Sequence, residues 1–419
     1  MGQQTSGIRT QARHSSLTLA ILLGLTITSL SAQGQTFTVL HAFTGSPDGM
    51  QPTSLLEVNG TLYGTTLFGG RYGFGTIFKV SSQGKESVLY SFTGGKDGAN
   101  PTELVPDNKG NVYGVAQGGG NSSCRITGLT GCGVIFKISS NKLTVLYTFS
   151  GGTDGALPQQ VVVGPSGDLY GVAEFGGDLS CIAGNGYGCG VVFKLNLSGT
   201  ETVLYTFSNF VDGILPVGLI MDSAGNLFGT TALGGGGGLT CNGGYGCGVV
   251  FEIKTTGAEV ALYTFTGAAD GGSPNAGLLI DSKRNLYGTA SIGGDLSCVG
   301  ISSGGCGVVF KVSAAGVETV LHTFSGPDGA NPGAGLMASM GEAYGETSAG
   351  GAGTFGVLFV LSTDGEKVLY NFKGSTDGEY PQSGLIMDSV GNLYGTASSG
   401  GDLSCNPPYG CGTVFRLAP

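Results

Sequence analysis

Short apolar runs separated by glycine-containing turns follow one another along almost the whole chain. Between residues 201 and 253 the runs are Glu201–Phe207, Gly218–Asp222, Asn226–Thr231 and Gly248–Ile253, each five to seven residues long. Their length and their content of Val, Leu, Phe and Thr predict β-strands. The segment Asp222–Gly225 predicts a tight turn with glycine at a position of positive φ. Apolar residues fill both sides of most runs, which indicates sheets covered by neighbours on both faces.

The same four runs recur in seven copies. In each copy an aromatic residue is followed directly by glycine, and Gly-Gly stands six and seven residues after it. The seven aromatic residues are Tyr63, Tyr113, Tyr170, Phe228, Tyr287, Tyr344 and Tyr394. A Gly-x-x-Phe signature, an apolar run ending in Phe and an Asp-Gly-x-x-Pro motif complete every copy, and the copies are 48 to 59 residues apart. Four antiparallel strands in a repeat of this length are typical of a β-propeller blade.

The two ends of the chain carry complementary parts of one copy. The repeats begin with a fourth-strand run, Phe37–Phe43, and stop after a third-strand run, Gly412–Leu417. Joining these segments in one blade closes the ring and removes two exposed sheet edges. We therefore predict an all-β fold, a seven-bladed β-propeller of four-stranded antiparallel blades, with its ring closed by an N-terminal strand that joins the C-terminal blade.

Glycine accounts for 83 of the 419 residues, a level that by itself would favour disorder. However, 40% of the residues are hydrophobic and the mean hydropathy is +0.21, so the chain can bury a core. Five columns of the repeat hold glycine in all seven copies, which places 35 of the glycines in repeated turns. The glycine excess therefore agrees with the propeller.

The N-terminus has the organisation of a secretory signal peptide. Arg9 and Arg13 precede an uncharged apolar run, Leu17–Leu30, and the small residues Ser31–Gly34 follow it. The apolar run is shorter than the roughly 20 residues that a membrane anchor needs. We predict a signal peptide over residues 1–34, a single seven-repeat domain over 35–419, and no membrane span in the mature chain. The protein is then secreted, and extracellular or periplasmic.

The charge balance limits the choice of partners. Without Arg9 and Arg13 the chain carries 16 basic and 28 acidic residues, a net charge of −12. Nucleic acids and anionic membranes select for clustered Lys and Arg, so we expect neither as a partner. We expect a monomer that engages an extracellular polysaccharide or a protein.

The repeat columns resemble those of the GloVer tandem-repeat family. The resemblance rests on Leu-Tyr-Gly-Thr-Thr with Gly-Gly, on Gly-Val-Val-Phe-Lys-Leu, and on Val-Leu-Tyr-Thr-Phe with Asp-Gly-x-x-Pro, over residues 36 to 419. It implies an exported bacterial repeat scaffold, in a family whose repeats are followed by varied C-terminal surface anchors. It implies no reaction and no catalytic residues. The last residues, Arg416–Pro419, show no hydrophobic tail, so we expect no anchor of that kind.

All ten cysteines lie in the predicted exported domain, in pairs between the second and third strands of five copies. The pairs are Cys124 with Cys132, Cys181 with Cys189, Cys241 with Cys247, Cys298 with Cys306, and Cys405 with Cys411. The connection is longer in these copies, which favours a disulfide that staples each loop. Zinc ligation is the alternative, but the chain has no Cys-x-x-Cys pair and little His, and we predict no metal site. Phe74 and Phe355 replace the second Cys elsewhere and are expected to fill the same buried loop base.

Histidine and aspartate give two further repeat columns. His41 and His322 stand where the other copies have Tyr, so we interpret them as replacements in a packed strand. The seven Asp-Gly-x-x-Pro motifs predict turns in which Asp caps the backbone and Gly takes positive φ. A ring of seven carboxylates that binds cations around the channel is the alternative.

Three glutamates depart from the repeat register and are candidates for catalysis. Glu346 replaces a Thr or Val of the second strand, and Glu174 and Glu103 occupy variable positions. A glycosidase or lyase needs two such carboxyls close together. Glu174 and Glu346 belong to copies that are not adjacent, so we predict no catalytic residue.

Except for Phe37, the aromatic residues outside the repeat columns fall in the second-to-third and fourth-to-first connections, which emerge on the same face of an up-and-down blade. Such residues suit a recognition surface, although pinning neighbouring loops is an equal alternative. The predicted ligand-binding residues are Phe68, Tyr72, Phe175, Tyr187, Tyr245 and Tyr409.

These patterns together favour an exported non-catalytic β-propeller that acts as a binding or scaffold module at the cell surface or outside the cell, without a cofactor. The alternative is a carbohydrate-active enzyme, a glycosidase or lyase, that uses loop carboxylates. A purely structural surface-layer component is the third possibility.

Overall fold

The computed structural model describes residues 35–107, 109–126, 128–139, 142–181, 186–208, 210–236, 241, 244–298 and 304–419. The predicted signal peptide, residues 1–34, lies outside the described residues. Gln35–Pro419 forms one compact unit. Among the described residues, no helix has the length and apolar character to cross a membrane.

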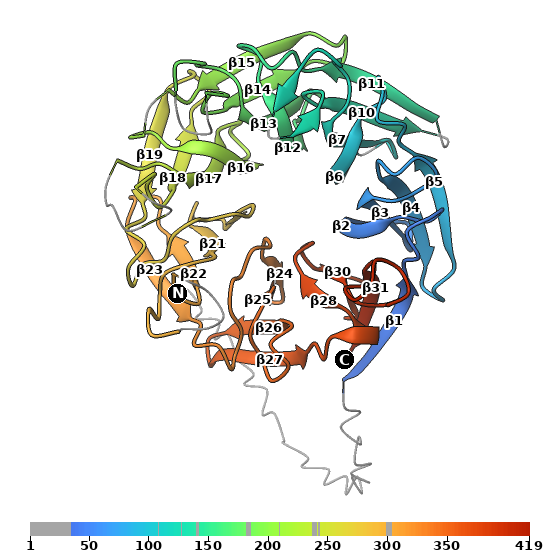
Figure 1. The fold of residues 1–419 in the computed structure, drawn as a ribbon. Helices are drawn as coiled ribbons and strands as arrows, with labels where there is room; N and C mark the ends of the chain where they lie inside the picture. Colours follow the sequence, from blue (N-terminus) through green and yellow to red (C-terminus); the bar gives the residue numbers. More distant parts are fainter. Residues whose placement is uncertain are drawn as a thin grey trace, which may run out of the picture. The chain divides into compact units, whose positions relative to one another are not determined.

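The unit is a ring of seven antiparallel sheets, with the first strand of each sheet at the centre and the fourth at the circumference (Figure 1). The seven-bladed propeller predicted from the repeats is confirmed. Each blade contains the four runs in the predicted order, because glycine-containing turns join consecutive strands that pair side by side.

Blades 1 to 4 have four long strands each. Blade 1 consists of β2 (Met50–Val58), β3 (Thr61–Phe68), β4 (Thr76–Ser81) and β5 (Glu86–Ser91). Blade 2 consists of β6 (Ala99–Pro106), β7 (Val112–Gly118), β10 (Val134–Ser139) and β11 (Lys142–Thr148), with a small hairpin of β8 (Arg125–Ile126) and β9 (Leu129–Thr130). Blade 3 consists of β12 (Ala156–Val163), β13 (Leu169–Phe175), β14 (Val191–Leu195) and β15 (Glu201–Thr206). Blade 4 consists of β16 (Ile214–Met221), β17 (Leu227–Leu233), β18 (Val249–Ile253) and β19 (Glu259–Thr264).

Blades 5 to 7 have shorter first strands. Blade 5 consists of β20 (Leu279–Ile280), β21 (Leu286–Ala290), β22 (Val308–Val312) and β23 (Glu318–Thr323). Blade 6 consists of β24 (Met337–Ser339), β25 (Glu342–Thr347), β26 (Val357–Ser362) and β27 (Gly365–Asn371). Blade 7 consists of β28 (Glu379–Pro381) and β29 (Ile386–Met387), which both pair with β30 (Leu393–Ser399), then β31 (Thr413–Ala418) and β1 (Thr36–Ala42), and the short helix η1 (Ser375–Asp377) precedes it.

The predicted closure of the ring is also confirmed. Strand β1 pairs with β31 from Thr36 opposite Ala418 to Ala42 opposite Thr413, so the N-terminal strand completes the C-terminal blade. The ladder joins the two ends of the ring and leaves no blade with three strands.

One inserted residue explains the short first strands. Blades 1 to 4 have two residues between the motif proline and the next buried apolar residue, as in Pro52 to Leu55, and the strand continues through a β-bulge. Blades 5 to 7 have three residues between this proline and the equivalent leucine, as in Pro274 to Leu278. There the ladder is interrupted at the insertion and pairs on both sides of it, as β28 and β29 do in blade 7. A bulge accommodates one extra residue in a ladder, and a second interrupts it.

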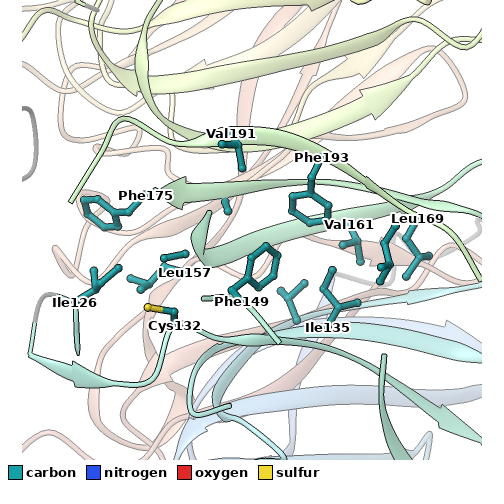
Figure 2. Packing of buried hydrophobic residues seen from close by; sticks show 14 of the residues in the cluster. Ile126, Cys132, Ile135, Phe149, Leu157, Val161, Leu169, Phe175, Val191 and Phe193 are labelled. Carbon is teal, nitrogen blue, oxygen red and sulfur yellow. The ribbon is translucent and has the colours of Figure 1, made fainter. Parts of the chain in front are cut away.

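The core lies between adjacent blades (Figure 2). Between blades 2 and 3, the rings of Phe149 and Phe193 meet edge to face with centroids 5.3 Å apart, and both side chains are fully buried. The same Phe–Phe contact recurs at the other junctions, for example between Phe207 and Phe251. These contacts explain why both repeat columns hold Phe.

Disulfides close the connection between the second and third strands in five blades. The pairs are Cys124–Cys132, Cys181–Cys189, Cys241–Cys247, Cys298–Cys306 and Cys405–Cys411, as predicted, with Cα atoms 5.1 to 5.8 Å apart. No cysteine of the described residues is free. The five disulfides agree with folding in an oxidising compartment.

The expectation that Phe74 and Phe355 fill the same buried base as the cysteines is only partly right. The second cysteine of every pair is 0% exposed, whereas Phe74 is 43% exposed and Phe355 is half-buried. The Phe74 ring lies over Gly94, just as the Cys124–Cys132 disulfide lies over Gly151. Phe therefore covers the same glycine of the following turn but keeps one side in solvent, because its ring is larger than a disulfide.

Candidate functional site

Each Asp-Gly motif forms a capped turn between the fourth strand of one blade and the first strand of the next. Asp154 accepts the backbone N–H of Ser150 at 2.7 Å and the hydroxyl of Tyr147 at 3.0 Å. The Tyr hydroxyl bond recurs at Asp97, Asp212, Asp270 and Asp377. At the other two turns the Nε2 atoms of His41 and His322 lie 3.0 Å from Asp48 and Asp328. The turn interpretation is confirmed, and the two histidines occupy the tyrosine column as expected.

The connections on this side of the blades pack against one another. The backbone N–H groups of Gly120, Gly177 and Gly294, each in a second-to-third connection, donate to carbonyls of the preceding Asp-Gly turns at 2.8 to 2.9 Å. We call the surface formed by the second-to-third and fourth-to-first connections the stapled face. Its loops are held both by disulfides and by these backbone bonds.

A cavity of about 720 Å³ occupies the central channel next to the stapled face. Residues from the beginnings of all seven first strands line it. Its polar side chains include the amides of Gln51, Gln159, Asn275 and Gln382, and Glu103 is its one ionisable side chain in the part of the chain that the structure describes.

Polar side chains near the channel connect neighbouring blades. In three blades the second-strand threonine donates to a backbone carbonyl in or just before the first strand of the next blade: Thr230 to Ala276 at 3.0 Å, Thr289 to Ala334 at 3.0 Å, and Thr396 to Pro52 at 3.2 Å. At the junction of blades 1 and 2, Thr65 bonds to Thr53, and Thr53 donates to the carbonyl of Pro101 at 3.2 Å. The threonine column is thus a set of connections between blades.

Blades 2 and 3 have valine in this column and use the first strand instead. Gln160 donates to Glu103 Oε1 at 2.9 Å, and the N–H of Leu219 donates to Gln160 Oε1 at 2.5 Å, which links blades 2, 3 and 4. Burial raises the pKa of Glu103 to about 8, although hydrogen bonds from Gln160 and the Val161 backbone partly oppose the shift. Glu103 Oε2 is shielded and accepts no hydrogen bond from the described residues.

Glu346 takes the threonine position in blade 6. It is 1% exposed, and its Oε1 accepts the N–H of Gly384 in blade 7 at 2.8 Å. Burial raises its pKa to about 8 against the effect of backbone donors at Gly384 and Ser383. With this bond, every one of the seven junctions has a polar connection near the channel.

Glu174 lies at the end of β13, where Gln159 donates to it and Gln117 donates to Gln159 at 2.9 Å. Burial raises its pKa to about 7. Glu103, Glu174 and Glu346 each accept a hydrogen bond from an amide group, and among the described residues no hydrogen bond joins two of these three carboxyls. The structure therefore does not bring the catalytic candidates together as a bonded pair.

The predicted ligand-binding aromatic residues divide into exposed and buried groups. Tyr72, Tyr245 and Tyr409 are 49%, 45% and 60% exposed. Phe68 and Tyr187 are half-buried. Phe175 is 5% exposed and packs edge to face on Tyr187 with centroids 6.0 Å apart, so it belongs to the core and not to a recognition surface. Tyr380, another aromatic residue that the sequence assigns to a fourth-to-first connection, is 39% exposed.

Disulfide-containing loops carry two of the three exposed tyrosines, Tyr245 and Tyr409. The carbonyl of Tyr245 accepts the N–H of Gly234 at 2.8 Å, and that of Tyr409 accepts the N–H of Gly400 at 2.7 Å. The Tyr245 ring also stacks on Phe210 with centroids 6.1 Å apart. Each ring is therefore presented from an ordered backbone on the stapled face.

The model of the Gloeobacter/Verrucomicrobia repeat matches residues 24–240 and 296–419, which confirms the resemblance seen in the repeat columns. No curated protein matches the chain.

Among solved structures, the propeller is similar to virginiamycin B lyase from Staphylococcus aureus, with 14% identity, a TM-score of 0.57, and coverage of 92% of this chain and 99% of the lyase. It is also similar to the extracellular domain of a B. thetaiotaomicron protein named as a hybrid two-component system, with 13% identity, a TM-score of 0.53, and coverage of 92% and 41%. At these identities the likeness concerns the fold alone.

Proposed function

Because the chain belongs to the Gloeobacter/Verrucomicrobia (GloVer) repeat family, whose repeats build a closed propeller here, we propose that it acts as an exported, non-catalytic binding module that recognises an extracellular polysaccharide or protein through its stapled face. The observation that carries the proposal is the exposure of Tyr72, Tyr245 and Tyr409 on that face. Rings that combine an apolar surface with a hydroxyl are the side chains most often used as anchors in recognition.

The rigidity of the loops supports this assignment. A side chain that is already ordered loses little conformational entropy on binding, so more of its contact free energy contributes to affinity. Tyr245 lies two residues before Cys247, and Tyr409 lies two residues before Cys411. The net negative charge of the domain favours neutral or basic ligands over anionic ones.

A carbohydrate-active enzyme is the second candidate, and one observation favours it. Glu103 lines the channel cavity with one oxygen lacking a partner among the described residues, and its raised pKa suits a general acid. However, a glycosidase also needs a second carboxyl, and Glu346 is buried while Glu174 bonds to Gln159. The arrangement of carboxyls therefore supports binding more than hydrolysis.

The test is binding to a panel of immobilised extracellular polysaccharides, with the wild-type protein and a Y72A/Y245A/Y409A variant. We expect the variant to bind at least about 30-fold more weakly, the equivalent of about 2 kcal/mol. A Y72F/Y245F/Y409F variant keeps the rings and should bind within a few-fold of wild type. Wild-type affinity in the alanine variant would remove the stapled face as the site.

A further inference from the structure

We propose that His322, Asp328 and Glu366 form a binding site for a divalent transition-metal ion such as Zn²⁺, at the outer edge of the junction between blades 5 and 6. The three side chains come from β23, from the turn that follows it, and from β27 of the next blade. Each offers one ligand atom, and these atoms all lie within 4.8 Å of one another.

The replacement of tyrosine by histidine distinguishes this junction. In five blades the column holds a tyrosine whose hydroxyl donates to the turn aspartate. Such a tyrosine is a poor ligand at neutral pH, because burial and the bond to Asp97 raise the pKa of Tyr90, for example, to about 12. A neutral imidazole has a lone pair for a metal, so His322 makes the same position able to ligate.

Two carboxyl groups converge on the imidazole. His322 Nε2 lies 3.0 Å from Asp328 Oδ2, and both side chains are about one-fifth exposed, at 19% and 23%. Glu366 is half-buried, and its Oε1 is shielded from solvent yet accepts no hydrogen bond from the described residues. The equivalent oxygens of Glu86, Glu201, Glu259 and Glu318 also accept no hydrogen bond from the described residues. The specific feature of this junction is therefore the imidazole that lies within reach of both carboxylates, where a cation would satisfy the shielded oxygen.

The donor set suits a first-row metal. One imidazole nitrogen and two carboxylate oxygens match sites of Zn²⁺ and related ions, with water in the remaining positions. Two carboxylate ligands in a site carry two negative charges, which a divalent cation cancels. Side-chain rotations would be needed to bring the three atoms to bonding distance, and the partial exposure of the side chains leaves room for them.

His41 provides a matched control within the same chain. It occupies the same column in blade 7, with Nε2 3.0 Å from Asp48, and Glu86 of blade 1 lies near this pair. Among the described residues, only His322, Asp328 and Glu366 form a group of three whose ligand atoms all lie within 4.8 Å of one another. Asp48 is also more enclosed, at 10% exposed, and its carboxylate accepts the N–H and the hydroxyl of Thr44.

The experiment is a titration of untagged protein with Zn²⁺ against a chromophoric chelator. Wild type should bind one equivalent. His322→Tyr installs the residue that five other blades carry, so the fold should be kept, and it should weaken zinc binding by more than about 100-fold. His41→Tyr should bind zinc as wild type does.

Three outcomes would overturn the proposal: no zinc binding to wild type at micromolar concentrations, wild-type affinity in His322→Tyr, or an equal loss in both histidine variants. Circular dichroism of each variant separates loss of the site from loss of the fold. Polysaccharide binding through the stapled face is measured separately, so either proposal can fail alone.

Discussion

Along the channel wall, threonine hydroxyls of one blade donate to backbone carbonyls of the next blade, whereas on the stapled face tyrosine rings remain about half exposed. Both regions come from the same repeats. On the wall, changes are compensated: where Val115 and Val172 replace threonine, Glu103 and Gln160 supply the connection. On the face, the rings of Tyr245 and Tyr409 stay 45% and 60% exposed, although Tyr245 stacks on Phe210, so both can still contact a ligand.

This difference between the channel wall and the stapled face helps to separate structural carboxyls from candidate functional ones. A carboxyl with a raised pKa is usually a functional-site candidate, but a structural hydrogen-bond network shifts pKa values as well. Glu346 is the clearest case, because it replaces a threonine that connects blades and bonds to the next blade itself. Its raised pKa follows from burial at a junction.

Among the substitutions proposed, Glu346→Thr on the channel wall has the largest expected effect on the free energy of unfolding. The pKa of Glu346 is raised to about 8 in the folded state, so its protonated form is favoured on folding. Its contribution to stability is complete below about pH 4.5 and is lost as the pH rises through 8. At pH 9 the variant should therefore be more stable than wild type by between about 3 and 5 kcal/mol, with little difference at pH 5.

Urea unfolding at both pH values checks this, with the exposed Glu57→Thr as control. Because other carboxyls titrate in both proteins, the difference between variant and wild type isolates Glu346. The same pH dependence in both proteins would show that the Glu346 carboxyl is not buried at the junction.

Removing one disulfide from the stapled face has the next largest expected effect on the free energy of unfolding. C181A/C189A opens a loop with a sequence separation of 8 residues, and the chain-entropy estimate for such a loop is a loss of about 2.5 kcal/mol in the free energy of unfolding. Phe74→Ala is the comparison in a blade without a disulfide, and it should cost less, since Phe74 is 43% exposed. Equal losses of stability in the two variants would mean that the Phe74 ring and the disulfide stabilise their loops equally. Blades with and without a disulfide would then not differ in this respect.

The propeller fold could be predicted almost completely from the sequence, because the same strand and turn signals recur in all seven copies. The pairing of β1 with β31 and the five disulfides follow from positions within or beside single copies. Contacts between copies could not be read in this way. Gln160 meets Glu103, and Glu366 meets His322, only because adjacent blades pack at a particular register.

The solvent exposure of the aromatic side chains was the second property that could not be predicted from the sequence. The sequence assigns both Phe175 and Tyr409 to second-to-third connections, yet Phe175 is 5% and Tyr409 is 60% exposed. Phe175 is the last residue of β13, so its ring turns into the space between blades, whereas Tyr409 follows the strand by ten residues and lies in the loop. A difference of position within one connection decides between core and surface.

The most direct test of the account compares the wall and the face on the same ligand. Wild type, Y72A/Y245A/Y409A and E103Q/E174Q are assayed on one panel of extracellular polysaccharides, with binding and release of new reducing ends recorded together. We expect the wild-type protein to bind without releasing product, the tyrosine variant to lose binding, and the glutamine variant to keep it. Product release by wild type that disappears in E103Q/E174Q would contradict it and establish an enzyme whose chemistry lies in the channel.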